Sequence, residues 1–301
     1  MNEEKATELC QTCLGECPQT ISYCAVGHGN YVYIVELKDR KVVVRCSEEA
    51  EAYKDTIYWL ERLVTLDVPV PRVLGKGTFE EYDYLILTYF KGEDIGIVYH
   101  DLTADEKRQI AREVMDIQNK VSALQLKDIP ADWTWKASFV EDMLVRAKER
   151  ILANGCYFDP EKVDRLMKEA ENFTDYFASI KPIAYLDDIS TKNLLIHKGQ
   201  VTGVIDIDWM GVGDKLTYVA MTKMALLNMG CDTDYVTYLL EEMGLTEEEK
   251  KAFAFYTLLY CVDFMGERGM WFMDKQVPVS PEIVAQMNGI YDQLWQEYGK
   301  I

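Results

Sequence analysis

The chain of 301 residues has 51 acidic and 32 basic side chains, which give a formal net charge of −19. This charge argues against unaided binding to nucleic acid, whose phosphates would be repelled, and is compatible with a cationic small substrate. An acidic surface that keeps a protein in solution explains the charge equally well. The acidic start at residues 1–5 is unlike a signal peptide, and the apolar run 252–262 is too short to cross a bilayer, so we expect a cytoplasmic protein without membrane contact.

Residues 3–15 predict a short N-terminal helix that is rich in cysteine. Cys10, Cys13 and Cys17 have a CxxCxxxC spacing that also suits a metal or iron–sulfur site. A structural zinc site needs four ligands, and the nearest fourth thiol is Cys24. We therefore expect an ordinary helix with reduced thiols and keep a cysteine-ligated metalloprotein as the alternative.

Alternating apolar side chains predict three strands next, at 20–26, 31–35 and 42–45. The loop between the first two strands is Gly27-His-Gly-Asn30. Glycines let backbone amides approach phosphate oxygens closely, and a cation on the following strand, here Arg45, can contact the same phosphates. The position of the loop between these strands is informative, because the loop sequence alone is common in ordinary turns.

A helix is predicted over 48–66, capped by Ser47, because apolar residues recur there at helical spacing. The prolines of Val68-Pro-Val-Pro-Arg72 end this helix and start an edge strand. Another apolar strand follows at 82–90. We place a lobe boundary here, with residues 1–90 in an N-terminal lobe and residues 91–301 in a larger, mainly helical C-terminal lobe. Later helix starts are marked by cap residues at 103–106, 159–160, 246–249 and 280–281.

The stretch that organises the chain is a predicted β-hairpin. Two apolar runs, 193–197 and 201–205, flank the turn Lys198-Gly-Gln200. Because a hairpin returns the chain to its starting edge, we expect Asp188, Asn193 and Asp206 to lie in one small volume. Three oxygen-bearing side chains at one rim suit a hard cation such as Mg²⁺.

This stretch resembles the catalytic core of the aminoglycoside phosphotransferase family. Asp188 followed five residues later by Asn193 is similar to the catalytic loop of that family, and Val204-Ile-Asp206, with Gly213-Asp214 beyond, is similar to its metal-binding segment. The resemblance implies an α+β, bilobal, protein-kinase-like fold with an N-terminal antiparallel sheet plus helix. One departure lies in the motif: Leu186-Asp187-Asp188 stands where the family usually has His-Gly-Asp, which puts the bracing of the loop in doubt.

The resemblance also implies roles for these residues. Asp188 would orient the acceptor hydroxyl and take its proton, while Asn193 and Asp206 would hold Mg²⁺ on the phosphates of ATP or GTP. In such kinases positioning and charge neutralisation supply most of the catalysis. The implied nucleotide-binding residues are Gly27, Gly29 and Asn30 in the covering loop, Arg45 at the position of a phosphate-binding lysine, Glu49 as its partner, and Leu87 and Tyr89 at the adenine edge.

The glutamate that would pair with Arg45 is open between Glu49 and Glu51. Glu49 is favoured because it lies one turn before Tyr53 on the apolar face of the predicted helix. A solvated acidic first turn is the simpler explanation of both glutamates.

The acceptor site is expected among the C-terminal helices, because the hinge and the glycine loop would bind nucleotide. Asp263, Glu267 and Trp271 recur at a spacing of four and would form one stripe on a helix. Together with Asp187 they could bind an amino sugar or a quaternary nitrogen through carboxylates and an aromatic face. A solvated acidic face with Trp271 packed beneath it is the alternative.

The predicted function is transfer of the γ-phosphate of ATP or GTP to a hydroxyl of an aminoglycoside-like or other cationic or sugar substrate. Members of the same family that act on choline, macrolides or homoserine define one alternative. A nucleotide-binding protein with little catalysis is a second alternative, because the bracing histidine is absent and the helix glutamate is uncertain.

Overall fold

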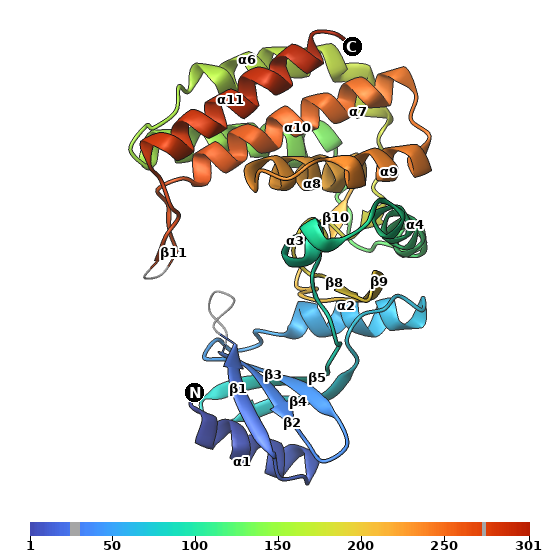
Figure 1. Cartoon of the computed structure of the whole chain (residues 1–301), viewed down its shortest axis with the longest axis vertical. Helices are drawn as coiled ribbons and strands as arrows, with labels where there is room; N and C mark the ends of the chain where they lie inside the picture. The colour runs from blue at the N-terminus through green and yellow to red at the C-terminus, as the bar shows by residue number, and fades with distance from the viewer. Residues whose placement is uncertain (25–30, 273–274) are drawn as a thin grey trace. The chain divides into compact units, whose positions relative to one another are not determined.

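The computed structural model describes residues 1–24, 31–272 and 275–301 (Figure 1). Contacts divide the chain into two units, which are described separately below. The first unit contains Met1–Glu93 and Asn193–Met210, and the second contains Asp94–Lys192 and Gly211–Ile301. The first division falls close to the expected boundary after residue 90. The hairpin segment, which was expected in the C-terminal lobe, is grouped with the N-terminal residues in the first unit.

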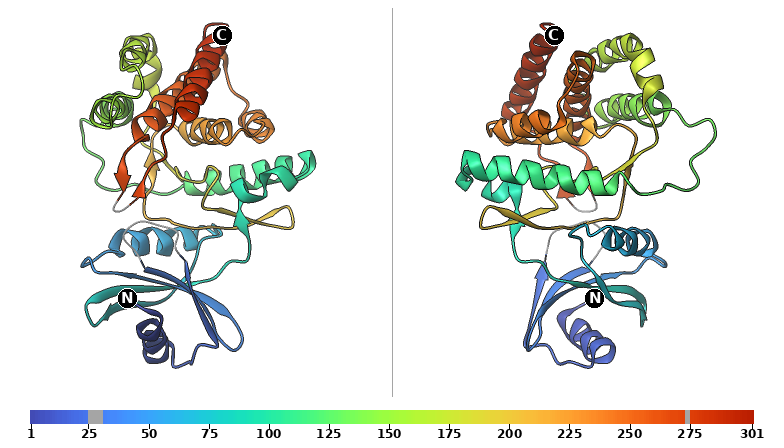
Figure 2. Two further views of the ribbon diagram at one scale, coloured as in Figure 1. Left: turned by 60° about the vertical axis from the view of Figure 1, so that its left-hand side comes forward. Right: turned by 90° about the vertical axis from the view of Figure 1, so that its right-hand side faces the viewer.

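The first unit is built on a five-stranded antiparallel sheet. Its strands are β1 (Thr20–Cys24), β2 (Tyr31–Glu36), β3 (Lys41–Ser47), β4 (Val73–Phe79) and β5 (Tyr82–Thr88), in the spatial order β1-β2-β3-β5-β4. Helix α1 (Glu3–Leu14) buries Leu9 and Cys10 against sheet residues such as Val35 and Val44. Figures 1 and 2 show α1 and α2 (Lys54–Thr65) on different sides of the sheet.

Helix α2 begins six residues later than the cap at Ser47 predicts. Ser47 is the last residue of β3, where it pairs with Asp83, and its hydroxyl accepts a hydrogen bond from the Glu49 N–H (3.2 Å). Glu51 has a left-handed backbone (φ 56°), which is incompatible with a helix. The predicted start at residue 48 is therefore wrong, because the strand continues through the expected cap and turns separate it from α2.

The predicted hairpin is confirmed. Strands β8 (Leu194–His197) and β9 (Gln200–Val204) pair antiparallel, and β6 (Glu93–Asp94) lies beside β8 in a three-stranded sheet. Gly203 packs against Phe90 so closely that an added Cβ would lie 2.4 Å from its ring. The Thr202 hydroxyl donates to the Lys91 carbonyl (2.8 Å), and the Val204 N–H donates to the Pro69 carbonyl (2.8 Å). These contacts attach the hairpin to the chain that follows β5 and to the segment that precedes β4.

The second unit is mainly helical. Its helices are α3 (Ile95–Val98), α4 (Ala104–Val121), α5 (Asp142–Ala153), α6 (Glu161–Ala170), α7 (Thr174–Ser179), α8 (Leu216–Asn228), α9 (Asp234–Met243), α10 (Glu247–Glu267) and α11 (Pro281–Tyr298). Short 3₁₀ turns cover Tyr99–Asp101 and Glu171–Phe173, and a π-helix covers Lys136–Glu141. The short strand pairs are β7 (Ala184–Tyr185) with β10 (Gly211–Val212), and β11 (Trp271–Phe272) with β12 (Lys275–Gln276).

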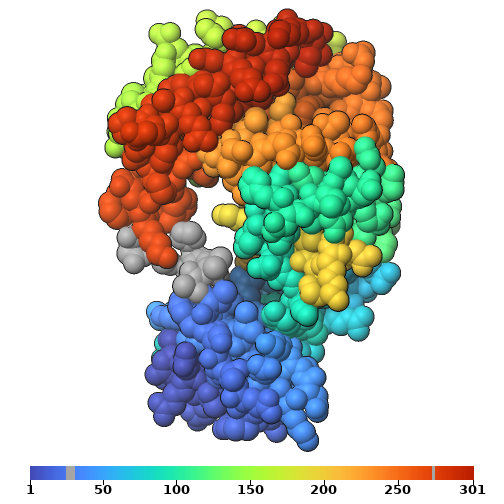
Figure 3. All heavy atoms as spheres, in the orientation of Figure 1, coloured from blue at the N-terminus to red at the C-terminus, as the bar shows by residue number. Residues whose placement is uncertain are grey.

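Helix α10 is the core of this unit. It is buried on most sides and packs against α5, α8 and α11. Figure 1 shows α11 along α10, and in Figure 3 the side chains of α11, in red, form an outer band of the unit. The predicted capping boxes at Thr103 and Thr246 are both present, and Ser280 caps α11 ahead of Pro281. No helix in the described part of the chain is both long and apolar enough to cross a membrane.

Candidate active site

Two of the predicted metal ligands lie at the open end of the hairpin. The Ile205 N–H donates to the Asn193 carbonyl (2.8 Å), so Asn193 and Asp206 leave neighbouring positions of the β8–β9 ladder. Both have left-handed backbones, with φ values of 65° and 59°. This conformation costs a non-glycine residue roughly 1–2 kcal/mol. Such strain is concentrated at functional sites, where the surrounding structure holds it in place.

Arg45 reaches this end of the hairpin from the middle of β3. Its side chain is 10% exposed, and the guanidinium makes a two-pronged contact with Asp208, Nη1 to Oδ1 at 3.1 Å and Nη2 to Oδ2 at 2.7 Å. Nη1 also lies 3.5 Å from Asp206 Oδ1. Thr56 of α2 donates its hydroxyl to Asp208 Oδ1 (2.5 Å), and the Tyr53 ring lies 5.3 Å from the guanidinium carbon. The fork of an arginine suits such planar contacts.

Arg45 and Asp208 each stabilise the charged form of the other. Burial by itself would raise the pKa of Asp208, but hydrogen bonds and charge attraction from Arg45 outweigh it and lower that pKa. Burial would likewise lower the pKa of Arg45, while its hydrogen bond to Asp208 raises it. Both side chains are therefore ionised at neutral pH, and the ion pair compensates the desolvation of the arginine.

Asp188 follows strand β7 in the second unit. The Leu186 N–H donates to Gln118 Oε1 (2.9 Å), and Gln118 Nε2 donates to the Leu186 carbonyl (2.8 Å). Gln118 is fully buried on α4. The Asp187 carboxylate accepts from the Asp188 N–H (3.1 Å), and burial, with a smaller contribution from the Asp188 charge, raises the pKa of Asp187 to about 6. The loop is thus braced through the backbone of the residue that replaces the expected histidine.

The Gly213-Asp214 pair is anchored to buried aromatic residues of the second unit. Asp214 Oδ2 accepts hydrogen bonds from the hydroxyls of Tyr176 (2.7 Å) and Tyr256 (3.0 Å), and Trp135 Nε1 donates to Tyr256 (2.7 Å). Gly213 has φ 131°, and a Cβ there would lie 2.2 Å from the Trp135 ring. The buried carboxylate therefore anchors the segment that follows β10 to the core of the second unit, and only glycine fits before it.

The predicted acceptor stripe is not formed as expected. Helix α10 ends at Glu267, and Trp271 lies in β11, where it is 65% exposed. Asp263 is buried, with its Oδ1 3.3 Å from Arg150 Nη1 and 3.8 Å from Arg146 Nε. Glu267 lies 3.9 Å from Arg150. The prediction of one stripe on one helix is wrong because the helix ends before Trp271. Asp263 is already paired with Arg146 and Arg150 of α5.

The remaining predicted nucleotide-binding residues are placed as follows. Gly27, Gly29 and Asn30 lie outside the described residues. Leu87 is buried in β5, paired with Val43 and Val73, and Tyr89 follows the end of that strand. Glu49 is exposed in the turns before α2, and the ion pairs of Arg45 in the described structure are with Asp206 and Asp208. The partner of Arg45 is therefore supplied by the segment after β9.

The eight cysteines are all free thiols. Cys10 is buried in the core of the first unit, Cys13 is partly buried and Cys17 is exposed. Burial raises the pKa of Cys10 to about 11, which disfavours the thiolate that a metal needs. Within the described ranges, no group of three histidine, cysteine or acidic side chains is placed to hold a metal ion.

The sequence and the fold are similar to those of known proteins. The model of the phosphotransferase enzyme family (APH) matches residues 20–239. The aminoglycoside 3'-phosphotransferase of Streptomyces fradiae is 24% identical over 223 residues, which cover 68% of this chain and 76% of that relative. A crystal structure of a thermostable mutant of aminoglycoside phosphotransferase APH(4)-Ia, a ternary complex with AMP-PNP and hygromycin B, has a TM-score of 0.68 at 16% identity and covers 98% of this chain and 99% of that chain. A putative fructosamine-3-kinase from Haemophilus somnus 129PT has a TM-score of 0.65 at 15% identity and covers 97% of each chain.

Fold and comparisons together define a small-molecule kinase with a protein-kinase-like α+β fold. The family model spans most of the chain, and the chain belongs to the phosphotransferase enzyme family. The predicted fold class and the predicted resemblance are confirmed.

Two residues of the site, Thr56 and Gln118, were not singled out from the sequence, and Asp208 was considered only as an aid to Asp206 at the metal site. Asp208 follows Asp206 by two residues, a spacing that keeps side chains on one face only in a regular strand. Thr56 looked like an ordinary helix residue. Gln118 is a polar residue among the apolar residues of α4, and this pattern is the signal that could have identified it.

Proposed function

We propose that this enzyme transfers the γ-phosphoryl group of ATP or GTP to a hydroxyl group of a small molecule. The observation that carries the proposal is the guanidinium of Arg45 beside Asp206, at the end of the hairpin that also carries Asn193. A fixed cation beside an oxygen-rich hairpin end is the arrangement that binding and charge neutralisation of a triphosphate require. We propose residues 1–90 as the nucleotide-binding lobe and residues 91–301 as the catalytic and acceptor-binding lobe, with the hairpin segment Asn193–Met210 contributing to nucleotide binding.

Each residue then has a distinct role. Arg45 contacts phosphate oxygens, and the backbone at Leu87 and Tyr89 holds the adenine or guanine edge. The Asn193 amide oxygen and the Asp206 carboxylate are hard oxygen donors of the kind that Mg²⁺ takes, so these residues fit the ion, which would neutralise the phosphate charge. Asp188, exposed on a braced loop, accepts the proton of the acceptor hydroxyl.

The acceptor is proposed to be an aminoglycoside or a related small polyhydroxy molecule. The relative from Streptomyces fradiae is named as an aminoglycoside 3'-phosphotransferase, and the APH(4)-Ia complex contains hygromycin B. The net charge of −19 is compatible with a cationic acceptor. Asp187 and the exposed Trp271 keep their proposed acceptor roles, whereas the arginines around Asp263 and Glu267 reduce the charge available there.

That last observation favours a second candidate. An acidic group that is neutralised by Arg150 cannot also neutralise an ammonium group at full strength. A less cationic acceptor, such as a macrolide or a sugar, is therefore the alternative to an aminoglycoside. Choline and homoserine are further members of the acceptor class to test.

The test is a panel of acceptors assayed with ATP and with GTP in the presence of Mg²⁺. We expect γ-phosphate transfer to at least one acceptor, and an Asp188→Asn variant should lose about 10²–10⁴-fold of that rate while still binding nucleotide, because it loses only the proton acceptor. Asp175→Asn, at an exposed aspartate of the second unit, is the matched control and should keep full activity. Nucleotide binding without transfer to any acceptor would support a binding protein with little catalysis.

A further inference from the structure

We propose that Asp208 is the positioning residue for Arg45, and that Thr56 links it to helix α2. The inference rests on the proposed nucleotide-binding role of Arg45 and names the group that orients it. Asp208 engages both terminal nitrogens of the guanidinium, at 3.1 and 2.7 Å. A two-pronged contact fixes the plane of the guanidinium as well as its position, which a single-point contact cannot do.

Asp206 does not provide the same constraint. The ion pair that joins it to Arg45 is Nη1 to Asp206 Oδ1 at 3.5 Å, which is too long for a strong charge-assisted hydrogen bond. Nη2 is held by Asp208 Oδ2 at 2.7 Å. Removing the Asp208 charge would therefore leave the arginine with one weak carboxylate contact and free its plane to turn.

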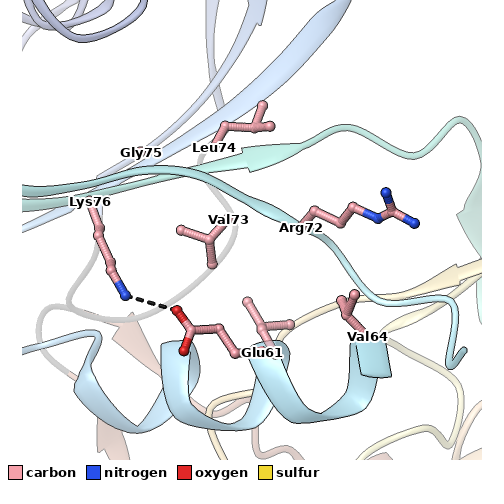
Figure 4. A pocket seen from close by; sticks show the side chains of 8 residues that line it. Glu61, Val64, Arg72, Val73, Leu74, Gly75 and Lys76 are labelled. Carbon is pink, nitrogen blue, oxygen red and sulfur yellow. Dashed lines mark hydrogen bonds and ion pairs between the residues drawn. The ribbon is translucent and has the colours of Figure 1, made fainter. Parts of the chain in front are cut away.

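The carboxylate partner cannot come from α2 in this arrangement. That helix, Lys54–Thr65, carries two acidic residues, Asp55 and Glu61. Glu61 forms an ion pair with Lys76 of β4 (2.9 Å). Figure 4 shows this pair at one end of a pocket between α2 and β4, which Val64 and Val73 also line. Asp55 is exposed in the first turn.

The two glutamates before the helix are also placed elsewhere. Glu49 is exposed, and its N–H is held by the Ser47 hydroxyl. Glu51 lies 3.6 Å from Lys54. The position where a helix glutamate was expected is thus occupied by turns, and Asp208 is the carboxylate that meets the arginine fork.

Thr56 supplies the link to α2. It is 3% exposed on the same face of the helix as Leu60 and Leu63, and its hydroxyl donates to Asp208 Oδ1 (2.5 Å). A buried face fixes the helix against the rest of the first unit, so this hydrogen bond fixes Asp208 in turn. The segment that carries the proposed metal ligand Asp206 thereby also aligns the phosphate-binding arginine.

The test measures binding of Mg²⁺ and ATP together by titration calorimetry, which needs no knowledge of the acceptor. Wild type should bind. Asp208→Asn should weaken binding about 10-fold or more, because the guanidinium of Arg45 would no longer be held in one orientation for the phosphates. Thr56→Val should weaken binding about 3-fold, as expected for one neutral hydrogen bond. The double variant should bind no more weakly than Asp208→Asn, because Thr56 acts through Asp208.

Several controls make the result specific. Asp55→Asn and Glu61→Gln remove the acidic groups of α2 itself and should bind like wild type, and Thr56→Ser keeps the hydroxyl and should also bind like wild type. In transfer assays the nucleotide KM of Asp208→Asn should rise while the KM of the acceptor stays unchanged, a separation that general damage to the fold would not produce.

The outcomes separate the two proposals. If wild type binds neither ATP nor GTP in the presence of Mg²⁺, the proposed function is wrong. If wild type binds and Asp208→Asn binds equally well, or if Glu49→Gln weakens binding instead, the role of Asp208 is overturned. Should Asp208→Asn fail to fold, Thr56→Val against Thr56→Ser decides, and equal binding by these two variants would also overturn the proposal.

Discussion

Two short acidic segments of this enzyme are held in different ways. Leu186–Asp188 follows β7 in the second unit and is held by the neutral amide of Gln118, which is fully buried. Asp206–Asp208 follows β9 in the first unit and is held by Arg45 through an ion pair, in which the Asp208 side chain is 45% exposed. Both segments are fixed, but only one of them by charge.

The difference between these two segments distinguishes a polar contact that stabilises the fold from one that orients a charged side chain. Backbone groups that are buried in the core must find partners, and the loss of a partner costs the whole desolvation penalty of each group. An ion pair that is partly in water adds little to the folding free energy, yet it orients a charged group for a ligand. We therefore expect the Gln118 contact to act mainly on stability and the Asp208 contact mainly on nucleotide binding.

The largest change in stability should come from Gln118→Met. Methionine has a similar volume, so little cavity forms, but the N–H and the carbonyl of Leu186 both lose their partner. Two unsatisfied buried groups should lower the free energy of unfolding by about 2–5 kcal/mol, measured by urea denaturation. Gln109→Met, at an exposed position of the same helix, is the control and should change it little. An equal loss in both variants would show that the effect arises from α4 itself and not from the loop.

A smaller change of opposite sign is expected for Asp187→Asn. Burial is the main cause that raises the pKa of Asp187 to about 6 in the folded protein. An aspartate in the unfolded chain has a pKa of about 3.9. Between these pH values the folded state binds more protons than the unfolded state, so the stability of wild type falls as the pH rises from about 4 to 6.

Asparagine can still accept the Asp188 N–H and carries no charge. The variant should therefore be more stable than wild type at pH 8, by at most about 3 kcal/mol for a shift of about two pH units, with the advantage vanishing near pH 4. Denaturation at pH 4, 6 and 8 measures this. A difference between the two proteins that stays constant across these pH values would mean that the Asp187 carboxylate is not desolvated in the loop.

Features that depend on residues close together in the sequence could be predicted, and features that depend on distant residues could not. The hairpin was predictable because apolar runs and a Lys198-Gly-Gln200 turn are local signals, and the capped helix starts were predictable for the same reason. The start of α2 was not, because pairing of β3 with β5 competes with the cap at Ser47 and wins.

Long-range partners were harder to predict. Arg45 and Asp208 are 163 residues apart, and Gln118 and Leu186 are 68 apart, so no local pattern marks either pair. The acceptor stripe failed for a local reason: the spacing of four from Asp263 to Trp271 holds only while the helix continues, and α10 ends at Glu267. Local spacing therefore predicted that Asn193 and Asp206 lie at one end of the hairpin, whereas the residues that brace the two segments depend on tertiary contacts.

The smallest change in stability should come from Asp208→Asn, which tests the Arg45–Asp208 ion pair. The variant keeps an acceptor for Thr56 and for one nitrogen of Arg45, and the aspartate it replaces is partly in water, so the free energy of unfolding should fall by only about 1 kcal/mol. The difference from wild type should shrink further in 1 M NaCl, because salt screens exposed charges. Urea denaturation at low and high salt measures both effects. A loss as large as that of Gln118→Met, unchanged by salt, would mean that this ion pair stabilises the fold in the same way as the buried amide, and the division between a stabilising contact and an orienting contact would not hold.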